Sequence, residues 1–132
     1  MIAITSISPG HANFENQFNA VESWKQAGYK VISLNSKEEI VKLKTFKEVE
    51  FVETTRTNER IFDKPYVLIS AIIDHLKTID GEHFLIINSD IIINDPFKIE
   101  STLKKTSEKG VVVMNRADFS NDISGKKIRA WI

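Results

Sequence analysis

Short β-branched runs alternate with longer stretches of helical periodicity in the first third of the chain. Ile2–Ile7 is apolar and β-branched, which predicts a buried strand. Apolar residues then recur at helical spacing from Phe14 to Trp24, and Gly28 follows as a stop signal. Tyr29–Leu34 predicts a second strand. The chain therefore begins as a strand, a helix and a second strand.

The next segment carries a helix start signal and a third strand. Ser36 stands three residues before Glu39, the spacing of a capping box, so a short helix is expected there. Glu48–Thr54 alternates loosely and predicts a strand. The polar and charged stretch Thr54–Lys64 predicts a loop.

A longer helix and the most apolar strand of the chain come next. Pro65 suits a first helical turn, with Asp63 as its N-cap, and the apolar face continues until Gly81. Phe84–Ile87 predicts a buried strand. A polar tripeptide interrupts the apolar residues, which then resume at Ile91–Ile93.

The last third predicts one more helix and two strands. Asp95 and Pro96 open a helix that runs through Leu103. Val111–Asn115 predicts a strand, and the alternating tail Lys127–Ile132 predicts an edge strand.

This alternation predicts a single α/β domain over residues 1–132, with three layers (α/β/α) and a mostly parallel sheet. In such sheets ligands collect at the carboxyl ends of the strands. Polar residues occur at four predicted strand ends: Thr5 to Ser8, Asn35-Ser36, Thr54-Thr55 and Asn88-Ser89-Asp90. Their agreement predicts a ligand site at that edge.

The amino-acid composition argues against several classes of function. Lys plus Arg equals Asp plus Glu at 18 each, which argues against a general nucleic-acid or anionic-membrane surface. The sequence has no cysteine, so it has no disulfide, thiolate site or cysteine nucleophile. Its apolar runs are far shorter than the roughly 20 residues that span a bilayer. We expect a cytoplasmic protein that does not insert into a membrane.

Asp90 is the strongest candidate for chemistry, because it interrupts an apolar strand. A carboxylate there loses hydration, which is costly unless a cation or hydrogen bonds compensate. Mg²⁺ or Mn²⁺ needs only one or two protein carboxylates when a diphosphate and waters supply the other ligands. The alternative is an Asp that caps a turn after the strand, since Asp favours turns.

The decapeptide from Phe84 to Ile93 resembles the strand that carries the Asp-x-Asp motif of GT-A glycosyltransferases. The resemblance implies that Asp90 binds a metal that bridges a nucleotide-sugar diphosphate. The first motif position is Asn88, which can hydrogen-bond a ribose hydroxyl but carries no charge. The order of elements extends the resemblance over essentially the whole chain. GT-A domains normally continue into an acceptor-binding part, which we expect to be reduced or absent here.

The resemblance also implies a donor site around Asp90. Its expected nucleotide-sugar-binding residues are Thr5, Ser6, Ile7, Asn35, Thr54, Arg60, Lys64, Asn88, Ser89, Arg116 and Asp118. Thr5, Ser6 and Ile7 would line the base pocket, and Lys64 would face the diphosphate. The alternative for each polar residue is a satisfied turn or a solvated loop position. His11 follows the end of the first strand and could approach a phosphate, but it is interpreted as a loop histidine.

The implied function is a metal-dependent glycosyltransferase that uses a nucleoside-diphosphate sugar, with UDP-sugar favoured and slow donor hydrolysis as a side reaction. The alternative is a non-catalytic nucleotide-sugar-binding module, or a subunit that needs a partner to bind its acceptor. The chain lacks the glycine-rich signatures of dehydrogenases and P-loop NTPases and the elbow of serine hydrolases. No catalytic base, acceptor or sugar is assigned. A homodimer that buries Trp131 and the edge strand is a further hypothesis.

Overall fold

A computed structural model describes residues 1–81, 83–106, 111–114, 117–121 and 127–131. In the last two ranges it describes the backbone alone. The chain divides into two compact units, Met1–Asn94 and Asp95–Ile132. The sequence predicts one domain over the same length.

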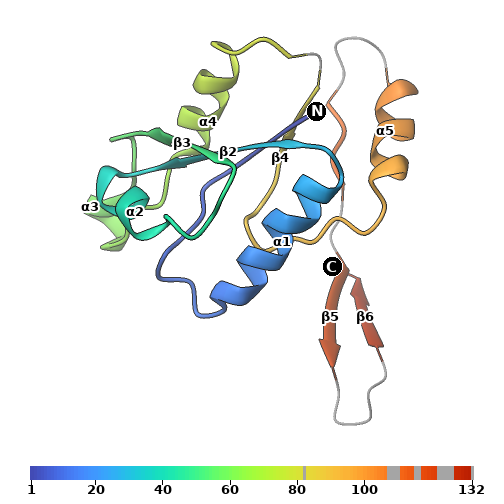
Figure 1. The fold of residues 1–132 in the computed structure, drawn as a ribbon, viewed down its shortest axis with the longest axis horizontal. Helices are drawn as coiled ribbons and strands as arrows, with labels where there is room; N and C mark the ends of the chain where they lie inside the picture. The colour runs from blue at the N-terminus through green and yellow to red at the C-terminus, as the bar shows by residue number, and fades with distance from the viewer. Residues whose placement is uncertain (82, 107–110, 115–116, 122–126, 132) are drawn as a thin grey trace. The chain divides into compact units, whose positions relative to one another are not determined.

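The first unit is built on a parallel sheet (Figure 1). Its strands are β1 (Ile2–Thr5), β2 (Lys30–Asn35), β3 (Val49–Glu53) and β4 (Phe84–Ile86). They are hydrogen-bonded in the order β3-β2-β1-β4, and every neighbouring pair is parallel. The predicted α/β fold with a parallel sheet is therefore confirmed in this unit.

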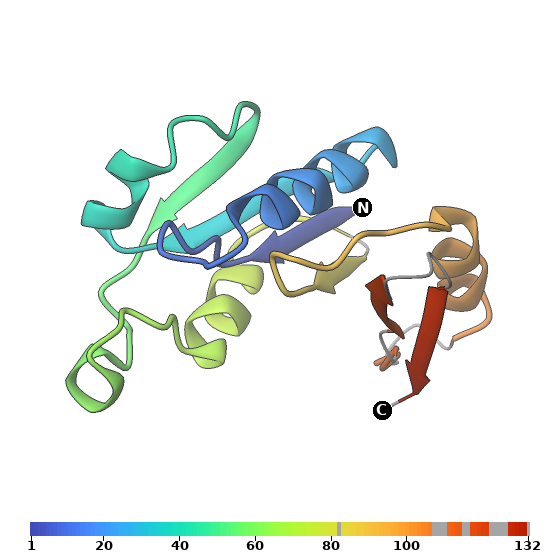
Figure 2. The same cartoon turned by 90° about the horizontal axis from the view of Figure 1, so that it is seen from below.

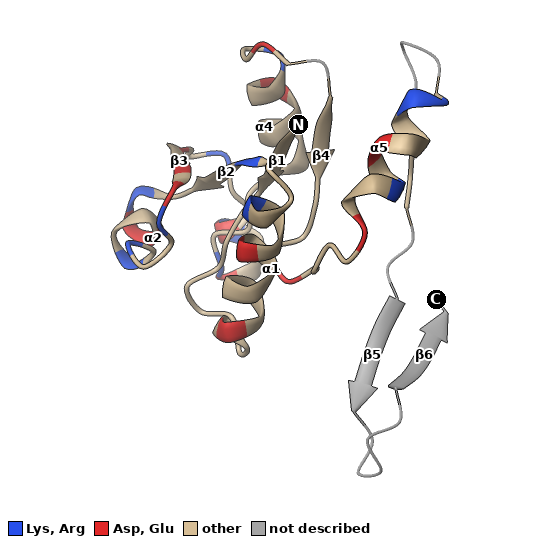
Figure 3. Cartoon of the chain, turned by 45° about the vertical axis from the view of Figure 1, so that its right-hand side comes forward, with Lys and Arg blue, Asp and Glu red and all other residues tan. Residues whose placement is uncertain are grey.

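Helices cover both faces of this sheet. The helices of this unit are α1 (Phe14–Gln26), α2 (Lys37–Lys42), α4 (Ile69–Leu76) and the short α3 (Glu59–Phe62), which buries no residue. Figure 2 shows α1 and α4 on opposite sides of the strands. Helix α2 carries charges of both signs (Figure 3).

Strand periodicity divides the core into two clusters, because successive side chains point to opposite faces of a sheet. Ala3 and Val31 pack beneath α1 with the fully buried Trp24. Ile4 and Ile32 pack beneath α4. This arrangement confirms the three-layer prediction for the first unit.

Local signals place the ends of two helices where the sequence predicts them. Ser36 and Glu39 form both hydrogen bonds of the capping box at the start of α2. Gly28 follows α1 with a φ of 79°, a left-handed conformation that glycine adopts without a Cβ clash. Both features depend on residues that are close in sequence.

The segment between β3 and α4 differs from the prediction. The expected loop contains the short helix α3, and Asp63 ends that helix with a φ of 51° instead of capping the next one. Pro65 lies outside a helix, and α4 begins at Ile69. A β-bridge between Thr57 and Val67 holds the residues after Pro65 in an extended conformation. The predicted helix start at Pro65 was wrong because this non-local pairing outweighs the local helix signal.

The second unit contains a helix and a hairpin. Helix α5 spans Pro96–Lys104, and Asp95 caps it by accepting a hydrogen bond from the Lys98 N–H at 3.0 Å, as predicted. Strands β5 (Ala117–Asn121) and β6 (Lys127–Trp131) pair antiparallel. Strand β6 confirms the predicted tail strand.

The strand expected at Val111–Asn115 was wrong over residues 111–114, which adopt no regular structure, while Asn115 lies outside the described residues. A β-branched run becomes a strand only where a neighbour pairs with it. Within the described ranges this segment forms no ladder, whereas β5, which sequence did not predict, pairs with β6.

Candidate functional site

The parallel sheet brings the carboxyl ends of its strands to one edge. Thr5 of β1 pairs with Ser33 of β2, and Asn35 of β2 pairs with Glu53 of β3. Strand β4 runs beside β1 in the same direction. The predicted strand-end residues of β1, β2, β3 and β4 therefore share an edge, as parallel pairing requires.

The Asn88–Asp90 turn follows β4 and is anchored to α1. The Ile91 N–H donates to the Asn88 carbonyl at 3.2 Å, which closes the turn. Trp24 Nε1 donates to the Ile91 carbonyl at 2.8 Å, and the Ile93 N–H donates to Ser23 Oγ at 3.1 Å. These hydrogen bonds hold the apolar residues after Asp90 against α1.

Gln17 links this turn to the loop after β1. Its side chain is fully buried, and its Oε1 accepts from the Ser8 N–H at 2.9 Å and from Ser89 Oγ at 2.6 Å. Its Nε2 donates to the Ser8 carbonyl at 2.8 Å. One side chain therefore fixes two strand ends. Sequence reasoning missed it, although a glutamine in register with Ala20, Val21 and Trp24 on a buried stripe was the available signal.

His11 and Asp90 meet between these two anchored segments. His11 Nε2 lies 3.8 Å from Asp90 Oδ2, and the two side chains are 34% and 35% exposed. This separation exceeds hydrogen-bonding distance, so each group keeps capacity for another partner. The sequence interpretation of His11 as an ordinary loop residue did not anticipate this contact.

Asp90 can serve as one ligand of a shared metal site. Among the residues that the structure describes, no three His, Cys, Asp or Glu side chains gather closely enough to hold a metal. A cation that takes its other ligands from a diphosphate and water requires only one or two carboxylates. The partly exposed Asp90 fits a site in which one carboxylate shares the cation with a diphosphate and water.

The predicted base-pocket residues are mostly interior. Thr5 and Ile7 are 2% and 0% exposed, while Ser6 is half-buried. Thr54 is half-buried, and its Oγ1 accepts from the Arg56 N–H at 3.1 Å. In this conformation only Ser6 and Thr54 of these four reach the surface of the strand-end edge.

Asn35 belongs to a closed polar network beneath that edge. Its Oδ1 accepts from Ser33 Oγ at 2.6 Å, and its Nδ2 donates to the Ile7 carbonyl at 2.7 Å and to Glu39 Oε2 at 2.9 Å. The Asn35 side chain is fully buried. Its amide therefore joins β1, β2 and α2 and is not presented to a ligand.

A cavity lies beyond the carboxyl end of β3. It is an open surface depression of about 370 Å³, lined by Thr55, Thr57, Asn58, Glu59, Arg60 and Ile61, most of which are exposed. The predicted residue Arg60 thus contributes to a concave site. Lys64 is exposed and lies outside that lining, five residues before α4 begins. Asn88 is exposed, and Ser89 is half-buried.

Two predicted residues lie elsewhere in the chain. Arg116 lies outside the described residues. The backbone of Asp118 belongs to β5 opposite Ala130, and its side chain is not among those described. The side chain of Trp131 is likewise not among those described, so the homodimer hypothesis stays a prediction.

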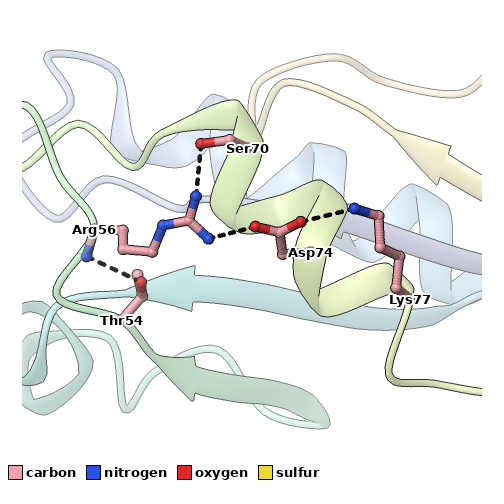
Figure 4. Close-up of polar contacts among 5 residues, drawn as sticks. All are labelled: Thr54, Arg56, Ser70, Asp74 and Lys77. Carbon is pink, nitrogen blue, oxygen red and sulfur yellow. Dashed lines mark hydrogen bonds and ion pairs between the residues drawn. The ribbon is translucent and has the colours of Figure 1, made fainter.

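Arg56 fastens the segment after β3 to α4 (Figure 4). Its Nη1 donates to Asp74 Oδ2 at 2.7 Å, and its Nη2 donates to Ser70 Oγ at 2.9 Å. Lys77 Nζ donates to Asp74 Oδ1 at 2.9 Å. Arg56 is therefore paired, although 46% of its side chain remains exposed.

This contact predicts an unusual titration. Hydrogen bonds from Lys77 and then Arg56 hold the pKa of Asp74 below its usual value of 3.8. A depressed pKa stabilises the fold above about pH 4, and the contribution is lost as pH falls through the folded-state value. We expect Lys77→Met to raise the Asp74 pKa more than Arg56→Met, measured by NMR of the carboxyl carbon. Lys42→Met on α2 is the control, and ordinary titration of Asp74 in the unmodified protein would contradict the prediction.

Comparisons with protein-family models, with curated proteins and with solved structures find no match. Among the described residues, no helix has both the length and the apolar character needed to cross a membrane.

Proposed function

We propose that the protein is a metal-dependent glycosyltransferase that uses a nucleoside-diphosphate sugar, with UDP-sugar favoured as the donor. The observation that carries the proposal is the anchored Asn88–Asp90 turn at the carboxyl edge of a parallel sheet. That turn leaves Asp90 partly exposed beside His11. A carboxylate held in this way suits Mg²⁺ or Mn²⁺ shared with a diphosphate.

The distance between the carboxyl ends of β3 and β4 supports a nucleotide as the ligand. The order β3-β2-β1-β4 separates the β3 end from the β4 end by three strand spacings, roughly 14 Å. This distance is comparable with the length of an extended nucleoside diphosphate. The depression of about 370 Å³ next to Thr55 would take the base, the Asp90 end would take the diphosphate, and the ribose would lie between them, towards Asn88.

The residues of the chain would divide the work of donor binding. Asp90 would hold the cation, which when bound neutralises charge on the leaving diphosphate. The exposed Asn88 carboxamide can both donate to and accept from a ribose hydroxyl. Arg60 supplies a fixed positive charge at the cavity. Transfer would break the bond between the sugar and the diphosphate and join the sugar to an acceptor oxygen.

Asp90→Ala tests the proposal. We expect UDP-sugar affinity, measured by calorimetry with Mn²⁺, to fall roughly ten- to hundredfold, because a ligand of the shared cation is lost. Addition of a chelator to the unmodified protein is expected to have the same effect. Asp80→Ala, at an exposed position between α4 and β4, is the control. Equal affinity in Asp90→Ala and the unmodified protein would refute the metal site.

Turnover separates an enzyme from a binding module. An active transferase is expected to release UDP slowly from UDP-sugar with water as a poor acceptor, and chromatography would detect that release. Metal-dependent binding without any UDP release in the presence of varied acceptors would favour the non-catalytic module or a subunit completed by a partner.

A further inference from the structure

His11 presents a hydrogen-bond donor at the Asp90 end of the site. The Asn13 N–H donates to His11 Nδ1 at 3.0 Å, so Nδ1 uses its lone pair as an acceptor. A neutral imidazole that accepts at Nδ1 carries its hydrogen on Nε2. The imidazolium also carries a hydrogen there. The atom that faces Asp90 is therefore an N–H group.

This tautomer limits what His11 can bind. A metal ligand needs a lone pair on the coordinating nitrogen, and Nε2 would gain one only if the hydrogen moved to Nδ1. That change would place the Nδ1–H against the Asn13 N–H and break their hydrogen bond. The geometry favours an anionic acceptor for Nε2–H over direct coordination of a cation.

Hydrogen bonds hold both the loop that carries His11 and the turn that carries Asp90. The His11 N–H donates to the Ser8 carbonyl at 3.3 Å, and Ser8 is bonded twice to Gln17. Asp90 follows Ser89, which is bonded to the same Gln17 side chain. The 3.8 Å approach of Nε2 to Asp90 Oδ2 is thus set by a buried residue that both segments share.

We infer that His11 donates its Nε2–H to a diphosphate oxygen of the nucleotide, next to the cation that Asp90 would hold; this inference rests on the proposed function. Nε2 is too far from Asp90 Oδ2 for a direct hydrogen bond, so its donor capacity is not used there. A hydrogen bond to a phosphate oxygen is charge-assisted and therefore strong. The diphosphate gains charge as the sugar departs, so this contact strengthens towards the transition state.

Two substitutions test the Nε2–H donor of His11 separately from the hydrogen bond that Nδ1 accepts from the Asn13 N–H. His11→Asn places an amide oxygen near the position of Nδ1, where it keeps the Asn13 hydrogen bond but loses the group that reaches Asp90. His11→Gln places an amide nitrogen near the position of Nε2 and keeps a donor there. The pair therefore tests the chemistry of Nε2 with little change in the size of the side chain.

The experiment measures UDP and uridine affinity with Mg²⁺, UDP by calorimetry and uridine by ligand-observed NMR. We expect His11→Asn to weaken UDP binding by roughly tenfold or more, and His11→Gln to weaken it much less. Uridine, which has no diphosphate, is expected to bind all three proteins alike.

Three outcomes would count against these statements. Unchanged UDP affinity in His11→Asn, with affinity lost in Asp90→Ala, would overturn the inference and leave the proposed function standing. Equal losses in His11→Asn and His11→Gln would overturn the donor role. Unchanged affinity in Asp90→Ala would overturn the proposed function itself.

Discussion

Trp24→Ala is expected to lower the free energy of unfolding by about 3–5 kcal/mol. The indole is fully buried in the cluster between α1 and the sheet, so its removal leaves a large cavity. It also removes the Nε1 hydrogen bond to the Ile91 carbonyl, which lies directly after Asp90. Urea denaturation followed by far-UV circular dichroism would measure the loss.

Trp24→Phe separates the packing of the indole from its hydrogen bond. Phenylalanine fills part of the space but cannot donate, so we expect a smaller loss, about 1–3 kcal/mol. It also frees the segment after Asp90, so UDP affinity is expected to fall in a protein that still folds. A loss below about 1 kcal/mol in Trp24→Ala would show that this helix does not anchor the core.

Gln17→Leu is expected to lower the free energy of unfolding by about 2–4 kcal/mol. Leucine has a similar size, but it leaves the Ser8 N–H and the Ser89 hydroxyl without this partner and removes one of the two hydrogen bonds to the Ser8 carbonyl. Each polar group that loses its partner in a partly buried site costs about 1–3 kcal/mol, and water would recover part of that cost. Urea denaturation is again the measurement.

Gln26→Leu provides the matched control, because Gln26 lies on the same helix and is exposed. A surface change of this kind usually alters stability by less than about 0.5 kcal/mol. UDP affinity should also fall in Gln17→Leu, since the His11 loop and the Asp90 turn lose their common tie. Equal effects of the two substitutions would argue against Gln17 as the residue that joins the strand ends.

Features that depend on neighbouring residues could be predicted from sequence. The Ser36 capping box, the glycine after α1 and the Asp95 cap each involve groups within a few residues of one another. The alternation of apolar strands with amphipathic helices was sufficient to predict a parallel sheet covered on both faces. The parallel sheet in turn predicted which strand ends share an edge, including the one that carries Asp90.

The partners of the polar side chains depended on tertiary structure. Asn35 seemed available to a ligand, yet packing of α2 against β2 buries it and satisfies its amide through Ile7 and Glu39. Gln17 seemed one polar residue among many on α1, yet it bonds to Ser89, 72 residues away. The bonds from Asn35 to Ile7 and from Ser89 to Gln17 have no local signature, because each requires the sheet to be assembled first.

The sequence by itself determined the four strands of the first unit, helices α1 and α2, the direction of the strands and the place of Asp90 at their carboxyl edge. Periodicity and capping act over a few residues and need no knowledge of the fold. Only the tertiary structure decided that the chain forms α3 where a loop was expected and that His11 faces Asp90. The approach of His11 to Asp90 arises from contacts between segments distant in sequence, whose free energy outweighs local preference once the segments are packed together.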